Sequence, residues 1–358
     1  MSNKLLEGKK VLVTGGTGSL GKVLIRRLLQ GDLGDPEQIV IFSRDEAKQH
    51  YLRLEYQNRN VAVDDFLYKN FHAKVSFRIG DIRSYPDVCA ALKGMDYVFN
   101  TAALKQVPSC EYFPHQAVET NIDGAQNIVR AIREHSLNVN TVVGISTDKA
   151  CQPVNVMGMT KAIQERIFIK ANLESPETRF VVVRYGNVMA SRGSVIPLFH
   201  EQIRNGGPIT ITTSEMTRFL LTLNDAVDLI FAALKYGKAG DTMIPRIPAA
   251  KVTDVAKVII EDRKIEIEEI GIRPGEKIHE TLISEEEASR AYEFDKNYFI
   301  IKSALPELNT VDSLKKAVFS TGYSSGSDLM DFESLKKLLI KNELLIKDHI
   351  PLDREILR

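Results

Sequence analysis

Short apolar runs alternate with amphipathic stretches over the first half of the chain. Runs with the length and hydrophobicity of buried strands occur at 9–16 (KKVLVTGG), 38–44 (QIVIFSR), 74–81 (KVSFRIGD), 95–103 (MDYVFNTAA), 141–148 (TVVGISTD) and 179–188 (RFVVVRYGNV). Apolar residues at helical spacing lie between them, at 21–30 (GKVLIRRLLQ) and 126–136 (QNIVRAIREHS). Strands that alternate with helices are typical of parallel strands joined by crossovers. We therefore predict an α/β fold with a doubly wound parallel sheet, the Rossmann architecture.

The pattern becomes mixed after about residue 190. A turn is indicated by Gly206, Gly207 and Pro208, and the segment 264–277 (KIEIEEIGIRPGEK) alternates like a strand before a loop. The segment 320–328 (STGYSSGSD) is typical of a polar loop, and 332–342 (FESLKKLLIKN) of a terminal helix. We expect a cofactor-binding Rossmann domain over 1–190. Residues 191–358 should form mainly a smaller substrate-binding lobe, with some segments returning to the Rossmann domain.

Composition narrows the class of function. Lys plus Arg and Asp plus Glu number 47 each in 358 residues, which argues against a nucleic acid or an anionic membrane as partner and favours a small molecule. Cys89, Cys110 and Cys151 are scattered and predict neither disulfides nor a metal site, as expected in a reducing cytoplasm. No apolar run approaches the roughly 20 residues that span a bilayer, and no His pair has metal-binding spacing.

A glycine-rich turn joins the first strand to the first helix in VTGGTGSLG, residues 13–21. Glycine at such positions allows a tight turn and brings the backbone close to a pyrophosphate at the positive end of a helix. The context favours dinucleotide binding over a merely tight turn. The predicted contacts are Gly15, Thr17, Gly18, Ser19, Leu20 and Gly21.

The end of the second strand indicates which dinucleotide is bound. An acidic residue there would bind the ribose of NAD, whereas this chain has Ser43 and Arg44, and a guanidinium suits a 2′-phosphate. NADP is therefore favoured as cofactor, the alternative being that Arg44 is a solvated loop residue. Asp81, followed by Ile82, ends the third strand and could accept the adenine amino group, or could instead cap a helix.

These motifs resemble the extended short-chain dehydrogenase/reductase superfamily and, more narrowly, the bacterial UDP-N-acetylglucosamine 4,6-dehydratases, which are hydro-lyases. The segments that carry the resemblance are FSRDEAKQ, NTAALKQVPSCEYFPHQAVETNIDGAQN, STDKA, RYGNVMASRGSVIPLF, MTRFLLTLNDAVDLI and GIRPGEKIHETLIS. The resemblance implies NADP in the Rossmann domain and UDP-N-acetylglucosamine held over the nicotinamide by the C-terminal lobe. Such an enzyme oxidises C4 of the sugar, removes water across C5 and C6, and returns the hydride to C6.

The catalytic stretch departs from the superfamily pattern at one position. Met157 stands where the superfamily has its catalytic tyrosine, four residues before Lys161, which by resemblance holds the nicotinamide ribose. Resemblance also makes Asp148 the acid and Lys149 the base of the elimination. To act as a base, Lys149 must be desolvated or crowded by a cation, for which Lys105 and Lys161 are candidates.

Thr147 is the candidate to replace the tyrosine hydroxyl at the C4 oxygen, and it would pass the proton to water or another side chain. The alternative is structural: Asp148 caps the following loop and Lys149 is a surface charge. By resemblance, the remaining cofactor contacts are Ala102, Ala103, Lys105, Tyr185 and Asn187, and the substrate contacts are Lys105, Asn187, Val195, Arg218, Arg273 and Glu276. Each arginine could instead be a surface ion-pair partner.

Several interpretations stay open. The leading one is a UDP-N-acetylglucosamine 4,6-dehydratase, with or without inversion at C5, that feeds surface-glycan or nonulosonic-acid (pseudaminic acid type) synthesis. The alternative within the family is an epimerase or 4-keto reductase acting on the same sugar nucleotide. An alternative of another class is a non-catalytic NADP-binding sensor or scaffold, favoured only by Met157. The resemblance further implies a homo-oligomer.

Overall fold

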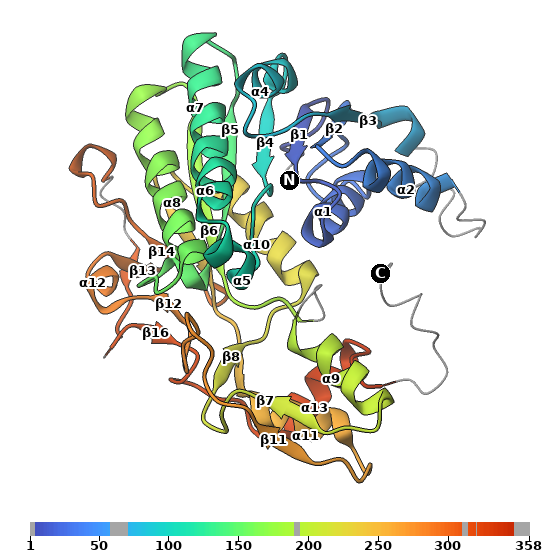
Figure 1. Cartoon of the computed structure of the whole chain (residues 1–358). Coiled ribbons are helices and arrows are strands. Elements are labelled where there is room, and N and C mark those ends of the chain that lie inside the picture. Colours follow the sequence, from blue (N-terminus) through green and yellow to red (C-terminus); the bar gives the residue numbers. More distant parts are fainter. Residues whose placement is uncertain (1–3, 58–70, 190–193, 310–313, 320, 347–358) are drawn as a thin grey trace.

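The computed structural model describes residues 4–57, 71–189, 194–309, 314–319 and 321–346, and a ten-stranded sheet forms its centre (Figure 1). Neighbouring strands run parallel in the order β3-β2-β1-β4-β5-β6-β9. They are β1 (Lys10–Thr14), β2 (Gln38–Ser43), β3 (Val75–Ile79), β4 (Tyr97–Asn100), β5 (Thr141–Thr147), β6 (Arg179–Tyr185) and β9 (Thr242–Pro245). The strands predicted from the sequence are β1 to β6, so the doubly wound sheet is confirmed. The strand order reverses between β1 and β4, where such sheets bind ligands.

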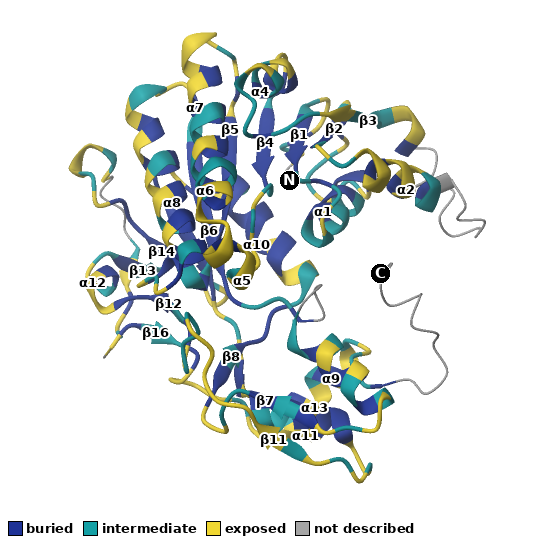
Figure 2. Ribbon diagram, viewed as in Figure 1, coloured by how far each residue is buried: buried dark blue, intermediate teal, exposed yellow. Residues whose placement is uncertain are grey.

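Helices cover both faces of the sheet, and each face has its own core (Figure 2). Along β1, Val11 and Val13 point to one face and Leu12 to the other, as the pleat of a strand requires. One face carries α1 (Ser19–Leu29), α2 (Glu46–Gln57) and α10 (Leu223–Tyr236). The opposite face carries α4 (Tyr85–Leu92), α7 (Gly124–Glu134) and α8 (Val156–Glu174). The strands are thereby buried on both sides, which explains their continuous apolar sequences.

Several C-terminal segments belong to the sheet rather than to a separate lobe. Besides α10 and β9, the antiparallel strands β14, β13 and β15 extend the sheet beyond β9. Their bounds are β14 (Tyr298–Ile301), β13 (Ala291–Glu293) and β15 (Lys315–Lys316). The sequence analysis did not identify these strands, because each is short and shows no buried-strand run.

The smaller lobe has a core of its own, in which Phe199, Ile259 and Leu335 are buried. It consists of α9 (Val195–Arg204), β7 (Ile209–Ile211), α11 (Val252–Ile260), β11 (Ile267–Glu269) and α13 (Phe332–Lys341). The strand expected over 264–277 is limited to β11, which pairs in parallel with β7. Gly271, with a φ of 85°, and the following Pro274 end the extended run.

The remaining elements of the described residues are short. They are β8 (Thr217–Phe219), β10 (Ala249–Lys251), β12 (Thr281–Ile283), β16 (Tyr323–Ser324), α5 (Val107–Tyr112), α6 (Pro114–Ala117), α12 (Glu285–Ala288), the π-helix η1 (Val118–Asp123) and the 3-10 helices η2 (Asp148–Ala150) and η3 (Pro306–Leu308). The strands β12 and β16 pair antiparallel, and β12 lies against η2. C-terminal residues are thus brought beside the Asp-Lys pair of the sequence motif.

Candidate active site

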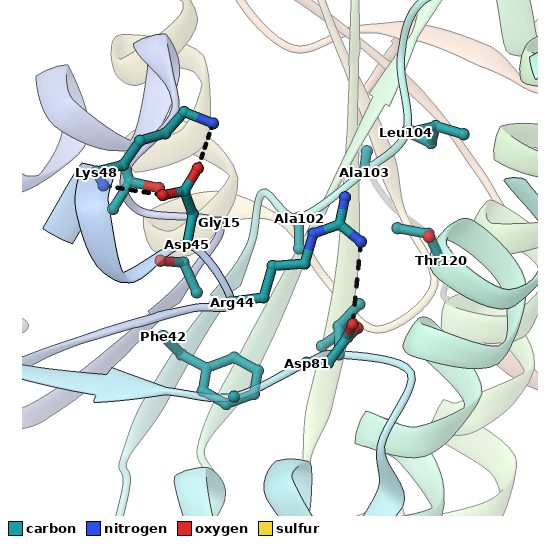
Figure 3. Close-up of a pocket in the computed structure, with 14 residues that line it drawn as sticks. Gly15, Phe42, Arg44, Asp45, Lys48, Asp81, Ala102, Ala103, Leu104 and Thr120 are labelled. Atoms are coloured by element: carbon teal, nitrogen blue, oxygen red, sulfur yellow. Dashed lines mark hydrogen bonds and ion pairs between the residues drawn. The ribbon is translucent and has the colours of Figure 1, made fainter. Parts of the chain in front are cut away.

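A pocket lies across the carboxyl ends of β1, β2, β3 and β4, at the point where the strand order reverses (Figure 3). Predicted cofactor residues in its lining are Gly15, Thr17, Ser43, Arg44, Asp81, Ile82, Ala102 and Ala103. The sequence analysis did not name the other lining residues, which are Phe42, Asp45, Lys48, Gly80, Leu104 and Thr120. Gly18, Ser19, Leu20 and Gly21 form the start of α1, directly after this lining.

The glycine turn leaves no room for side chains. Gly15 has a φ of 66°, and a Cβ atom there would lie 2.8 Å from the Cα of Ala102. A Cβ atom on Gly21 would lie 2.5 Å from the Cα of Gly16. The bare backbone therefore faces the pocket beside the amino end of α1, where its N–H groups and the helix dipole suit a pyrophosphate. These residues fit a dinucleotide.

Arg44 reaches across the pocket mouth towards Asp81. Its side chain is 63% exposed, and its Nη1 lies 4.0 Å from the Asp81 carboxylate (Figure 3). Asp81 is bound more closely by Arg83, whose Nη2 donates at 2.7 Å, and this pairing outweighs burial to keep the pKa of Asp81 low. Ser84, not Asp81, caps α4 through the Asp87 N–H, so the cap alternative for Asp81 is wrong.

A second group of polar residues lies at the end of β5. Thr147 Oγ1 donates to Asp148 Oδ1 at 2.8 Å, and Lys149 Nζ donates to the same oxygen at 3.1 Å. Lys149 Nζ also lies 3.0 Å from the Oε1 of Glu280. Asp148 is 0% and Glu280 2% exposed. Thr147 rather than Asp148 caps η2, and Lys149 pairs with two carboxylates, so the alternative of a capping Asp148 and a surface Lys149 is wrong. Sequence reasoning missed Glu280 because it selected Glu276 from the same motif.

The pKa values of Asp148, Lys149 and Glu280 are shifted in different directions by burial and by their neighbours. Burial raises the pKa of Asp148, with Lys149 opposing and Glu280 adding to the shift. Burial would lower the pKa of Lys149, but Asp148 and Glu280 together raise it above its ordinary value. Burial would raise the pKa of Glu280, yet Lys149 and Arg218 hold it below the ordinary value. Asp148 thus takes up a proton more readily than an ordinary aspartate, beside an ammonium–carboxylate pair formed by Lys149 and Glu280.

The expected crowding of Lys149 by Lys105 or Lys161 is therefore corrected. Two carboxylates hold the amine, and the cation that opposes them is Arg218. Lys161 is 5% exposed and donates to the Ile145 carbonyl and to Gln164 Oε1, and burial lowers its pKa to about 8. Spacing along the chain could not show which charges the fold gathers around the amine.

Met157 packs in an apolar cluster with Cys110 and Ala117 and is 5% exposed. Its position on α8 is thus filled by a hydrophobic contact with α5 and α6 rather than by an acid or base. The adjacent Gly158 lets α8 approach η2, since a Cβ atom there would lie 2.2 Å from the Lys149 carbonyl oxygen. Asn155 caps α8 by accepting the Gly158 N–H at 2.8 Å.

The other predicted residues are spread around these two groups. Tyr185 is buried, and burial together with the Asp148 charge raises its pKa. Asn187 has a buried Oδ1 without a hydrogen-bond partner among the described residues. Arg218 donates to the carbonyls of Thr217 and Ile278 and lies close enough to influence Glu280.

The last of the predicted residues lie nearer the surface. Lys105 and Arg273 are exposed. Val195 is the first residue of α9, and Glu276 accepts a long hydrogen bond of 3.4 Å from Thr212. Among the residues that the structure describes, no group of three or more His, Cys, Asp or Glu side chains could hold a metal ion. Within the same residues, no helix has the length and apolar character needed to cross a membrane.

A glycine turn, a pocket at the reversal of strand order and a polar cluster after β5 define a short-chain dehydrogenase/reductase of the extended type. The sequence model of one family, described as polysaccharide biosynthesis protein, matches residues 11–302. A UDP-glucose 4-epimerase from Rickettsia massiliae is 42% identical over 342 residues, covering 93% of this chain and 95% of its own. A UDP-glucose 4-epimerase from Rickettsia bellii is 43% identical over the same length. The chain belongs to the polysaccharide biosynthesis protein family.

Solved structures agree with this assignment. The X-ray structure of Pen from Bacillus thuringiensis matches with a TM-score of 0.84 and 38% identity, covering 95% of this chain and 99% of Pen. A dTDP-glucose 4,6-dehydratase from Streptomyces venezuelae, with NAD bound, matches with a TM-score of 0.61 and 20% identity over 75% of this chain and 86% of its own, a likeness of fold alone. The protein is thus a nucleotide-sugar-modifying enzyme.

Proposed function

We propose that the chain is an NADP-dependent UDP-N-acetylglucosamine 4,6-dehydratase. The observation that carries this proposal is the buried cluster of Asp148 and Lys149, joined by Glu280, at the end of β5. Elimination of water across C5 and C6 needs a base for the C5 proton and an acid for the C6 hydroxyl. Epimerisation at C4 alone needs neither group.

Each residue of the motif has a task in this reaction. A dinucleotide whose adenosine half occupied the pocket of Figure 3 would supply, through its nicotinamide, the hydride chemistry at C4 and C6. Lys149 removes the C5 proton, which the neighbouring C4 ketone makes acidic. Asp148, whose pKa burial raises, protonates the departing C6 hydroxyl.

Thr147 accounts for the missing tyrosine. Its Oγ1 donates to Asp148 Oδ1 at 2.8 Å, so a proton released by the C4 hydroxyl can pass through Thr147 to Asp148. The same proton then leaves with the C6 oxygen as water. In this account Met157 has no proton to exchange and contributes packing alone.

The remaining contacts follow from charge. Arg44 at the pocket mouth would bind the 2′-phosphate of NADP, and Lys161 the nicotinamide ribose. Arg218 and Arg273 would bind the diphosphate of the substrate, with Glu276 on its ribose. The residues proposed near the sugar are Lys105, Asn187 and Val195. Inversion at C5, a role in surface-glycan synthesis, a homo-oligomeric state and a cytoplasmic location stay predictions.

A second candidate is a UDP-sugar 4-epimerase, favoured by the name that the Rickettsia relatives carry at 42% and 43% identity. The two candidates differ in where the C4 hydrogen ends. The test is to incubate the purified protein and NADP with UDP-N-acetylglucosamine that carries deuterium at C4.

A dehydratase forms a product that is lighter by one water and carries the deuterium in a C6 methyl group, which mass spectrometry and proton NMR both detect. An epimerase leaves the mass unchanged and the deuterium at C4. If the mass is unchanged and the deuterium stays at C4, both with this substrate and with UDP-glucose deuterated at C4, the protein is an epimerase and the proposed dehydratase is wrong.

A further inference from the structure

Glu280 has no task in the reaction as described, although it completes the charged cluster. We propose that Glu280 is a positioning residue that holds the Lys149 amine and accepts its proton, so that the neutral amine can remove the C5 hydrogen of the sugar. This inference rests on the proposed dehydratase function. It assigns separate duties to the two carboxylates that contact Lys149.

The backbone of Glu280 is fixed on both sides. Its N–H donates to Ser325 Oγ at 3.0 Å, and its carbonyl accepts the Ser325 N–H at 2.8 Å. Ser325 is 0% exposed, and its hydroxyl is also 2.7 Å from that of Thr217. Ser325, in the segment 320–328 that was predicted to be a polar loop, thus ties the Glu280 backbone to Thr217 of β8. A loosely held carboxylate would not need this support.

The side chain of Glu280 has a bound and an open oxygen. Oε1 lies 3.0 Å from Lys149 Nζ. Oε2 is buried and has no hydrogen-bond partner among the described residues, as is also true of Asp148 Oδ2. Buried carboxylate oxygens are nearly always hydrogen-bonded in proteins, so an open one indicates a partner that arrives later. A proton or a sugar hydroxyl can fill that position.

The charged groups around the cluster leave Glu280 as the proton acceptor. Lys149, Arg218 and Lys277 face its carboxylate and keep it ionised at neutral pH. Asp148 also contacts Lys149, and burial raises its pKa, which favours its taking the C4 proton from Thr147 and giving it to the C6 oxygen. One carboxylate thus carries the proton from the C4 hydroxyl to the C6 oxygen, and the other is open to the amine.

The proton transfers balance. A sugar that covers the cluster excludes the remaining water, and desolvation favours a neutral amine beside a neutral acid over an ion pair. The Lys149 ammonium gives one proton to Glu280 and the free amine takes H5, while Asp148 gives its proton to the C6 oxygen. C5 is reprotonated from Lys149, which then recovers its proton from Glu280. The proton that Asp148 gives is the one that left the C4 hydroxyl and reached Asp148 through Thr147, so Asp148 ends ionised, as it began.

The test compares Glu280→Gln and Glu280→Asp with the wild type and with Glu285→Gln as matched control. Glu285 is an exposed residue of the same segment, at the start of α12. The full-length variants, loaded with NADP and given UDP-N-acetylglucosamine in deuterated water, are followed from pH 6 to pH 10. Two rates are recorded: reduction of the cofactor at 340 nm, which reports C4 oxidation, and deuterium entry at C5.

For Glu280→Gln we expect cofactor reduction within about threefold of wild type but C5 exchange about 100-fold slower at pH 7, the lower range for loss of a proton-transfer group. The slow rate should rise about tenfold per pH unit, because the Lys149 ammonium must then lose its proton to solvent. The wild type should be nearly independent of pH over this range. Glu280→Asp should recover much of the rate, and the control should behave as wild type.

Other results would overturn the inference. C5 exchange that is unchanged or faster at pH 7 would make Glu280 a counter-ion only, because removing its charge lowers the Lys149 pKa. An equal loss at every pH, with cofactor reduction lost as well, would make its role purely structural. If the wild-type enzyme dehydrates the sugar while Glu280→Gln gives either of these results, the proposed function holds and only the role of Glu280 is wrong. If the wild type releases no water, both the proposed function and the role of Glu280 are wrong. If Glu280→Gln does not fold, the wild type decides: C5 exchange that rises about tenfold per pH unit in the wild type would contradict the inference.

Discussion

Replacement of Gly158 by alanine should disable the active site without unfolding the protein. Gly158 lies in the first turn of α8, where the helix passes η2. An alanine Cβ would stand 2.2 Å from the Lys149 carbonyl oxygen, whereas ordinary contacts begin at 3.4 Å, so the carbonyl must retreat by about 1.2 Å. The same Cβ would be 3.2 Å from Cβ of Pro153, which limits movement of the helix instead.

The structure predicts that Gly158→Ala loses little stability but much of its catalytic rate. Overpacking costs about 1–3 kcal/mol, and alanine returns up to about 1 kcal/mol of helix propensity. The net loss of roughly 0–2 kcal/mol should lower the melting temperature by only a few degrees. A catalytic group displaced by about 1 Å can lose about 100-fold in rate. Lys149 and Asp148 both sit on the displaced turn.

The assay is product formation by mass spectrometry together with thermal unfolding. Met159→Ala, an exposed neighbour on the same turn, is the control and should change neither measurement by much. We expect Gly158→Ala to stay folded and to lose roughly two orders of magnitude in kcat. Wild-type kcat in Gly158→Ala would show that the position of η2 does not limit the reaction, and the reasoning would be refuted.

Three further predictions concern other parts of the fold. Arg184→Met should cost about 3–5 kcal/mol in unfolding, since Glu165 and Glu287 lose a buried partner within 3.0 Å. Arg184 lowers the pKa of Glu287 to about 2 against burial, so the wild-type advantage should shrink as pH falls below 4.5. Arg44→Ala should raise the KM for NADP roughly tenfold or more and leave that for NAD unchanged. Met157→Leu should keep product formation within about threefold, because volume-conserving swaps cost under about 1.5 kcal/mol. An unchanged melting temperature of Arg184→Met would contradict the first prediction, and an unchanged ratio of the KM values for NADP and NAD in Arg44→Ala would contradict the second. Loss of turnover in Met157→Leu would contradict the third.

The sequence was sufficient to predict the parallel sheet and many residues that line the pocket at its strand ends. Strands that are buried on both faces have continuous apolar sequences. Positions where two backbone segments come close together require glycine, as at Gly15. These signals are local, so they can be read without the fold. The strands β13, β14 and β15 escaped prediction because their residues neither form such runs nor alternate over enough length.

The charged cluster around Lys149 could not be predicted from the sequence alone, because the fold brings its members together. The Asp148–Lys149 pair is adjacent in sequence and resemblance indicated its roles. Glu280, however, arrives from a distant segment through β12, and its support comes from Ser325 in yet another loop. Burial of an ion pair and the sign of its pKa shifts depend on such distant neighbours. For the same reason the sequence suggested cations around Lys149, where the structure places carboxylates.

The central claim is that the cluster after β5 catalyses elimination across C5 and C6. The most direct measurement is to incubate the wild-type protein and NADP with UDP-N-acetylglucosamine in deuterated water, without added reductant, and to analyse the product by mass spectrometry and proton NMR. The account predicts loss of one water, one deuterium at C5 and a new C6 methyl signal. A product of unchanged composition, with no deuterium at C5, would contradict it.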